Sequence, residues 1–146
     1  MNIIAFFFRH LLAKCFLWEN SEQHQHPTKD ELGKDGEKRA EEFLKAKGYK
    51  IIARNVRFSV GEIDLIAQVE KTIIFIEVKT RKSAEYCHPM EVVNKKKRQK
   101  IKRMAMQYYR DKKYASKGFA IRFDIVTLIW PEGEQPKIEH FIDASR

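Results

Sequence analysis

Cysteine is scarce in this chain, which has only Cys15 and Cys87 among its 146 residues. The two cysteines do not form a Cys-x-x-Cys pair, and the five histidines are scattered along the chain. A disulfide framework or a zinc knuckle is therefore not expected. A reducing compartment, the cytoplasm, is the simplest location for such a chain.

The chain also lacks an apolar run long enough to cross a bilayer. Its most apolar stretch, from Ile3 to Trp18, is interrupted by Arg9, His10 and Lys14. It is shorter than the roughly 20 residues that a spanning helix needs. No basic region precedes it and no small-residue cleavage site follows it, so a signal peptide is not expected either. An interfacial amphipathic helix, a helix docked on the domain and a dispensable leader all remain open for this stretch.

Acidic residues are in deficit. The chain has 20 Asp and Glu against 29 Lys and Arg, which gives a net charge of +9. The excess is concentrated between Lys95 and Lys117, where eleven basic residues face Asp111 alone. A segment of this kind is either a solvated helix face or a surface that contacts phosphates, and its concentration favours the second. The predicted nucleic-acid-binding residues are Lys95, Lys96, Lys97, Arg98, Lys100, Lys102 and Arg103.

Length and composition fit one folded domain. The hydrophobic fraction of 43% and the charged fraction of 34% are ordinary for a globular protein with a single core. A polar run over residues 19–27 follows the apolar stretch and is typical of a linker. The predicted division is therefore an apolar segment with its linker over residues 1–27 and a domain over residues 28–146.

Residue patterns predict helices and strands in a definite order. Thr28 and Glu31 have the spacing of a capping box, so a helix should start there and end at Lys47, before Gly48. Glu37 falls at the edge of its buried stripe, formed by Leu32, Gly36, Ala40, Phe43 and Leu44. Strands are predicted at 49–58, 62–69 and 72–79, and their short links favour an antiparallel meander. A helix at 89–110, a strand at 120–130 and a short edge strand at 137–142 complete the domain.

Charged residues interrupt two of these strands at positions where apolar residues would be expected. Side chains alternate between the two faces of a strand, so Glu77 and Lys79 continue the apolar face of Phe75. Asp64 likewise interrupts an otherwise apolar strand. Charged groups among core residues need a partner or a function. One alternative is a structural ion pair between Asp64 and Lys79, with Glu77 at the rim of the sheet.

The other alternative is a site for phosphodiester hydrolysis. Hard divalent cations such as Mg²⁺ or Mn²⁺ prefer oxygen ligands, which Asp64, Glu77 and the carbonyl of Val78 would supply. Lys79 would contact the attacking water or the scissile phosphate. Glu37 would complete the acidic shell. The predicted catalytic residues are thus Glu37, Asp64, Glu77 and Lys79.

Two motifs, Gly61-Glu62-Ile63-Asp64 and Glu77-Val78-Lys79-Thr80-Arg81, resemble those of the PD-(D/E)xK nuclease superfamily, which has the restriction-endonuclease fold. From about Leu32 onward the chain is similar to the YraN-type family of predicted endonucleases. The further matching pieces, in the family's order, are residues 33–37, 48–49, 53–55, Lys97 and residues 122–124.

The resemblance implies an α/β fold with an αβββαβ core, in which helices flank a mixed central sheet. It also implies a site similar to that of archaeal Holliday-junction resolvases. Glu37 would then stand at the place of the helix glutamate, and Asp64, Glu77 and Lys79 at those of the Asp and Glu-x-Lys.

Three functions are compatible with these features. The first is a metal-dependent endonuclease that acts on DNA rather than RNA, with branched or flapped DNA among its substrates. The second is a protein of the same fold that binds nucleic acid without cutting it. The third is a membrane-associated protein that uses residues 3–18 as an anchor and its basic face to contact anionic lipid.

Overall fold

The computed structural model describes residues 28–82 and 95–144. The predicted N-terminal segment at 1–27 and residues 89–94 of the predicted second helix lie outside this range. The described elements are α2 (Lys29–Ala46), β1 (Lys50–Phe58), β2 (Gly61–Val69), β3 (Thr72–Arg81), α4 (Lys95–Asp111), a 3₁₀ turn (Ala115–Lys117), β4 (Ala120–Ile129) and β5 (Lys137–Phe141). The predicted succession of elements is confirmed.

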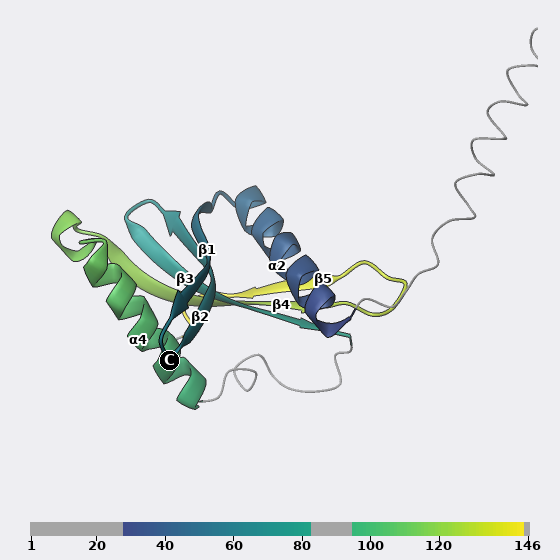
Figure 1. Ribbon diagram of the computed structural model, residues 1–146. Helices are drawn as coiled ribbons and strands as arrows, with labels where there is room; N and C mark the ends of the chain where they lie inside the picture. The colour runs from purple at the N-terminus through teal and green to yellow at the C-terminus, as the bar shows by residue number, and fades with distance from the viewer. Residues whose placement is uncertain (1–27, 83–94, 145–146) are drawn as a thin grey trace, which may run out of the picture.

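The strands form one mixed sheet in the order β1-β2-β3-β4-β5 (Figure 1). Strands β1, β2 and β3 are the predicted antiparallel meander, and β5 is an antiparallel edge strand on β4. Strands β3 and β4 are parallel because the connection between them contains α4, which returns the chain to the same end of the sheet. The fold is therefore α/β with a mixed central sheet, as expected for a restriction-endonuclease-like core.

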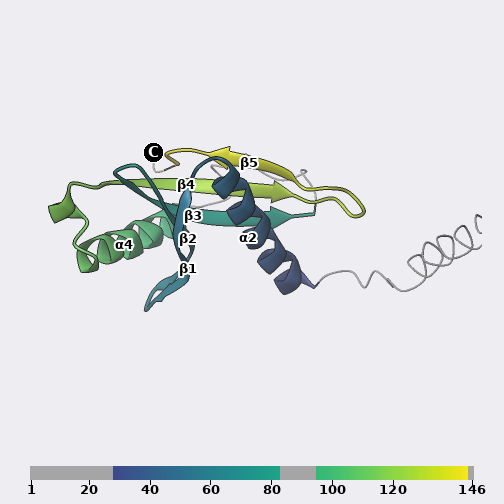
Figure 2. The same ribbon diagram turned by 90° about the horizontal axis from the view of Figure 1, so that it is seen from above.

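Each helix packs on its own face of the sheet, as the two views in Figures 1 and 2 show. Residues Ile101, Met104 and Ala105 of α4 pack with Ile73 and Phe75. Ala40 and Leu44 of α2 pack on the opposite face, in a cluster that also contains Ile74, Ile76 and Val78 of β3. Because β3 is covered on both faces, its sequence is almost continuously apolar up to Glu77.

Helix α2 begins at the predicted capping box. The N–H of Glu31 donates to Thr28 Oγ1 at 3.3 Å, and the N–H of Thr28 donates to Glu31 Oε2 at 2.8 Å. Gly36, Ala40 and Leu44 are buried, which confirms that part of the predicted stripe. Gly36 lies against Thr80 of β3 without room for a side chain, so α2 approaches β3 beside Lys79.

No helix among the described residues has the length and apolar character needed to cross a membrane. The apolar stretch at 3–18 lies outside those residues.

Candidate active site

Strands β2 and β3 separate at the predicted acidic residues. Their antiparallel pairing runs from Val69 and Thr72 to Leu65 and Ile76. Beyond this point the N–H of Val78 in β3 donates to a side chain of β2 rather than to its backbone. The acceptor is Asp64 Oδ2, at 2.7 Å. Strand β3 stays paired with β4 as far as Arg81. The site therefore lies in a fork between β2 and β3.

Burial and neighbouring negative charge perturb Asp64. Desolvation and the carboxylate of Glu77 raise the pKa of Asp64 to about 6, although the N–H of Val78 and the charge of Lys79 act in the opposite direction. A carboxyl group with a raised pKa in a cleft is typical of functional sites. A positive charge brought into the fork would stabilise the ionised form of Asp64.

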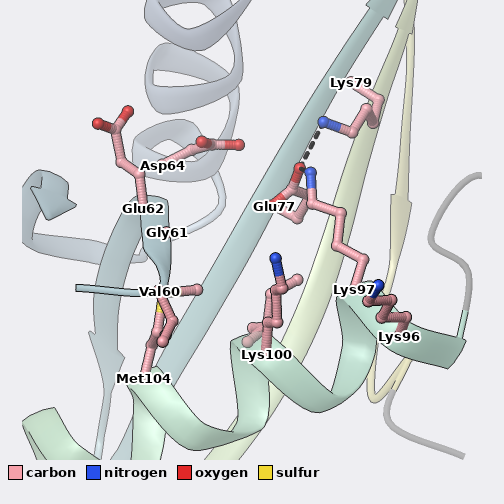
Figure 3. Close-up of a pocket in the computed structure, with 11 residues that line it drawn as sticks. Val60, Gly61, Glu62, Asp64, Glu77, Lys79, Lys96, Lys97, Lys100 and Met104 are labelled. Carbon is pink, nitrogen blue, oxygen red and sulfur yellow. Dashed lines mark hydrogen bonds and ion pairs between the residues drawn. The ribbon is translucent and has the colours of Figure 1, made fainter. Parts of the chain in front are cut away.

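Glu77 is the most deeply buried acid of the fork, with 3% of its side chain exposed. Lys79 Nζ and Lys97 Nζ both form ion pairs with Glu77 Oε1 (Figure 3). Burial acts to lower the pKa of Lys79, but the charge of Glu77 and its hydrogen bond raise that pKa above the ordinary value. Lys79 thus remains a cation. Its partner is Glu77, whereas the alternative of a structural ion pair had predicted Asp64 as the partner.

The fork opens into a cavity of about 520 Å³ between the β1–β2 hairpin and α4. Lys96, Lys97 and Lys100 line it from α4, and the side chains of Lys97 and Lys100 point toward Glu77 (Figure 3). The full lining is Val60, Gly61, Glu62, Asp64, Glu77, Lys79, Lys96, Lys97, Lys100, Ile101 and Met104. Acidic groups from two strands and ammonium groups from one helix therefore border the same cavity.

Glu37 approaches the fork from the α2 face and lines a neighbouring cavity together with Asn55. Desolvation raises its pKa, the side-chain hydrogen bond with Asn55 lowers it, and the charges of Glu62 and Glu77 raise it. Glu37 is therefore within electrostatic range of Glu77 without sharing its cavity. Its predicted place beside the site is compatible with an auxiliary acid.

Asn55 is a further residue of this region, and it was not among the predicted site residues. It lies in β1 with φ of 47°, between Arg54 and Val56, which pair with β2. Asn tolerates this left-handed conformation better than most residues other than Gly. The available signals were an Asn in the middle of a predicted strand and its place in the matching piece at residues 53–55. Its side-chain hydrogen bond with Glu37 acts to lower the pKa of that carboxyl group.

Among the described residues, no three His, Cys, Asp or Glu side chains are grouped closely enough to hold a metal ion by themselves. The oxygen donors at the fork are the carboxylates of Asp64 and Glu77. The carbonyl of Val78 lies on the same edge of β3 as its N–H, because both groups of a strand residue point the same way. This set resembles the partial protein shell of Mg²⁺ sites, in which water and substrate phosphates complete the coordination.

The basic residues of α4 do not all occupy equivalent positions. Lys95, Lys96, Lys100, Lys102 and Arg103 are exposed, whereas Lys97 and Arg98 are half-buried. The ion pair of Lys97 with Glu77 was not among the predictions. Lys97 thus belongs to the acidic cluster as well as to the basic helix.

A second polar cluster, around Asp124 of β4, is structural. Asp124 is fully buried and accepts from both Arg122 Nε at 2.9 Å and Arg122 Nη2 at 2.8 Å, and from the N–H of Asp143 at 3.0 Å. Its Oδ2 also contacts His140 Nε2 at 2.9 Å. Burial acts to raise the pKa of Asp124, but these hydrogen bonds lower it below the ordinary value. The cluster fastens β5 and the C-terminal turn to β4 and lines none of the cavities described above.

The segment that contains the fork matches a family model. Residues 36–128, which include Glu37, Asp64, Glu77, Lys79, Lys97 and Asp124, match the Uncharacterised protein family UPF0102. The chain belongs to the UPF0102 family. Membership confirms the predicted YraN-type relationship and gives the chain no established activity.

Relatives from distant bacteria support the assignment. A UPF0102 protein of Caldicellulosiruptor saccharolyticus is 44% identical over 69% of this chain and 84% of its own length. One from Thermodesulfovibrio yellowstonii is 42% identical over 78% of this chain and 95% of its own length. One from Renibacterium salmoninarum is 39% identical over 77% of this chain and 94% of its own length. These UPF0102 proteins are thus similar over most of their length to this chain.

Proposed function

We propose that this UPF0102 protein is a metal-dependent endonuclease of the PD-(D/E)xK superfamily that hydrolyses phosphodiester bonds in DNA. The observation that carries the proposal is the fork, where Asp64, Glu77 and Lys79 border one cavity beside the basic helix α4. The raised pKa of Asp64 supports it, because burial and the charge of Glu77 disfavour the ionised carboxylate, which a bound cation would favour.

The donor set fits Mg²⁺ or Mn²⁺ better than zinc, since the ligands that the described residues supply at the fork are oxygen atoms. Asp64, Glu77 and the carbonyl of Val78 would hold the ion. When bound, it would polarise the phosphate and make a water molecule more acidic. Lys79 keeps its proton and is positioned to orient that water or the phosphate. Glu37, from the other face, adds to the negative potential that attracts the ion.

The basic residues of α4 would bring the substrate to this site. Lys96, Lys97 and Lys100 line the cavity, so phosphates that they bind would lie beside the acidic residues. Backbone contacts of this type supply affinity without sequence preference. The proposal includes a preference for DNA over RNA, and for branched or flapped DNA over duplex DNA. Both preferences can be assayed directly.

A protein that binds nucleic acid without cutting it is the second candidate. One observation favours it. Glu77, a proposed metal ligand, already forms ion pairs with the ammonium groups of Lys79 and Lys97. The two candidates differ in their dependence on metal. Cleavage needs the ion and Lys79, whereas binding needs mainly α4.

The test is a cleavage assay on single-stranded, duplex, flap and four-way-junction DNA, and on matching RNA, with Mg²⁺ or Mn²⁺. Asp64→Asn, Glu77→Gln and Lys79→Ala should each abolish cleavage while leaving nucleic-acid binding intact. Glu62→Gln is the matched control, because Glu62 lines the same cavity but pairs with Arg57 at 3.0 Å on the hairpin. Wild-type protein that cuts no substrate with either metal would leave the binding protein as the function.

A further inference from the structure

Two lysines from different elements hold one oxygen of Glu77. Lys79 lies two residues further along β3 on the same face, and Lys97 lies in the first turn of α4. Both Nζ atoms contact Oε1. Because only 3% of the Glu77 side chain is exposed, its charge is compensated from within the protein rather than by solvent.

This arrangement opposes the binding of a metal ion at Glu77. A divalent cation added beside two ammonium groups would be repelled by both of them in a site with little water. Both ammonium groups also occupy Oε1, which is one of the two carboxylate oxygens available to an ion. The departure of one lysine from Oε1 would therefore weaken the repulsion and free that oxygen for coordination.

Lys97 is the lysine that can leave. Its side chain is 40% exposed, against 29% for Lys79. Lys79 is tied to Glu77 by their common strand face, whereas Lys97 reaches Glu77 across the cavity from a separate helix (Figure 3). The flexible four-carbon side chain of lysine allows such a change of partner without a movement of the backbone.

The chemistry of the first turn of α4 identifies what would draw Lys97 away. This turn contains Lys95, Lys96, Lys97 and Arg98 and no acidic residue. Cations are unfavourable near a helix N-terminus, where the dipole is already positive and anions are favoured. A phosphate in the cavity would meet this turn together with Lys100.

We propose that Lys97 is an exchangeable counter-ion of Glu77, displaced by a backbone phosphate of the nucleic-acid substrate. In the free protein Lys97 neutralises Glu77. When a phosphate binds the first turn of α4, Lys97 transfers to it and leaves Glu77 Oε1 to the metal ion. The inference rests on the proposed function, and it makes metal and nucleic acid each strengthen the binding of the other, since coupling between two ligands is reciprocal.

The first experiment measures Mn²⁺ binding to the full chain by calorimetry, without nucleic acid. Lys97→Met should bind Mn²⁺ about tenfold more tightly than wild type, equivalent to about 1.4 kcal/mol. Arg110→Met is the control, because it removes one positive charge from the same helix but lies in its last turn, outside the residues that line the cavity. Its affinity should stay close to that of wild type. Lys97→Arg, which keeps the charge, should resemble wild type.

The second experiment measures the coupling itself. Ca²⁺ affinity is determined with and without a short fluorescent DNA duplex, and a gel run afterwards establishes that the duplex is intact. The duplex should tighten Ca²⁺ binding to wild type and to Arg110→Met. It should have little effect on Lys97→Met, in which Glu77 has already lost that counter-ion.

The outcomes separate this inference from the proposed function. Equal metal affinity in wild type, Lys97→Met and Arg110→Met, with cleavage by wild type intact, would overturn the exchange of Lys97 alone. Wild-type protein that neither binds metal nor cleaves would overturn the proposed function together with it. Thermal melts of each variant establish that the comparison is made between folded proteins.

Discussion

Gly36 of α2 lies so close to β3 that a Cβ atom added to it would be 1.8 Å from Thr80 Oγ1. Thr80 follows Lys79, and Gly36 precedes Glu37. This contact therefore places Glu37 of α2 close to the residues that β3 contributes to the fork. The absence of a side chain at Gly36 is what allows Glu37 to come within electrostatic range of Glu77.

Gly36→Ala should destabilise the protein although alanine is the better helix former. Alanine gains about 1 kcal/mol over glycine in a helix interior, whereas overpacking costs about 1–3 kcal/mol. Gly33→Ala, in the same helix with nothing within 4 Å of the added Cβ, should stabilise the protein. Urea unfolding midpoints measure both changes. Thr80→Ala should partly rescue Gly36→Ala, and a stabilised Gly36→Ala protein would refute the close contact.

The raised pKa of Asp64 predicts that this residue makes the folded protein less stable as the pH rises. Its pKa is raised to about 6 in the folded protein from 3.8, so the folded state binds the proton more tightly than the unfolded state. The contribution of Asp64 to the free energy of unfolding should therefore fall as the pH rises from about 4 to about 6. A shift of this size corresponds to at most about 3 kcal/mol.

Asp64→Asn tests this dependence. The amide oxygen can still accept the N–H of Val78 and carries no charge at any pH. The variant should be more stable than wild type at pH 7, and the difference should shrink toward pH 4. Urea unfolding in metal-free buffer measures it. A variant less stable than wild type at pH 7 would mean that the Asp64 charge stabilises the fold as part of an ion pair.

Helix α4 should supply the electrostatic contribution to nucleic-acid binding. Each phosphate contact that is lost flattens the slope of log K against log salt on duplex DNA by about 0.9. The double variant Lys96→Ala with Lys100→Ala should therefore flatten the slope by about 1.8. Lys34→Ala with Lys38→Ala removes the same charge from α2, on the other face, and should leave the slope nearly unchanged. Fluorescence anisotropy over a salt series measures both slopes. Equal changes in the two double variants would contradict the assignment of the binding surface to α4.

Asp124 should be required for stability rather than for chemistry. Asp124→Ala leaves the half-buried guanidinium of Arg122 without its carboxylate, and the loss of one partner of a buried pair costs about 3–5 kcal/mol. Glu139→Gln is the control on β5. Glu139 pairs with Lys137 at 2.7 Å on the surface, where such pairs contribute about 1 kcal/mol or less. Comparable melting temperatures for the two variants would contradict the structural role of Asp124.

Local rules of the backbone were enough to predict most elements and part of the site. The alternation of side chains along a strand placed Glu77 and Lys79 on the face of Phe75, where they are found. The capping-box spacing of Thr28 and Glu31 predicted the start of α2. These features depend on residues close together in the chain, so their geometry is fixed by local backbone structure.

Contacts between distant segments could be determined only from the tertiary structure. The separation of β2 from β3 at Asp64, the left-handed conformation of Asn55 and the ion pair of Lys97 with Glu77 depend on how helices and strands pack. Nothing in the spacing of Lys97 and Glu77 specifies that pair, because the intervening chain can close in many ways. By itself the sequence determined which charged residues interrupt the core. Packing alone decided which of them neutralise one another, because that depends on side chains brought together from opposite sides of a cavity.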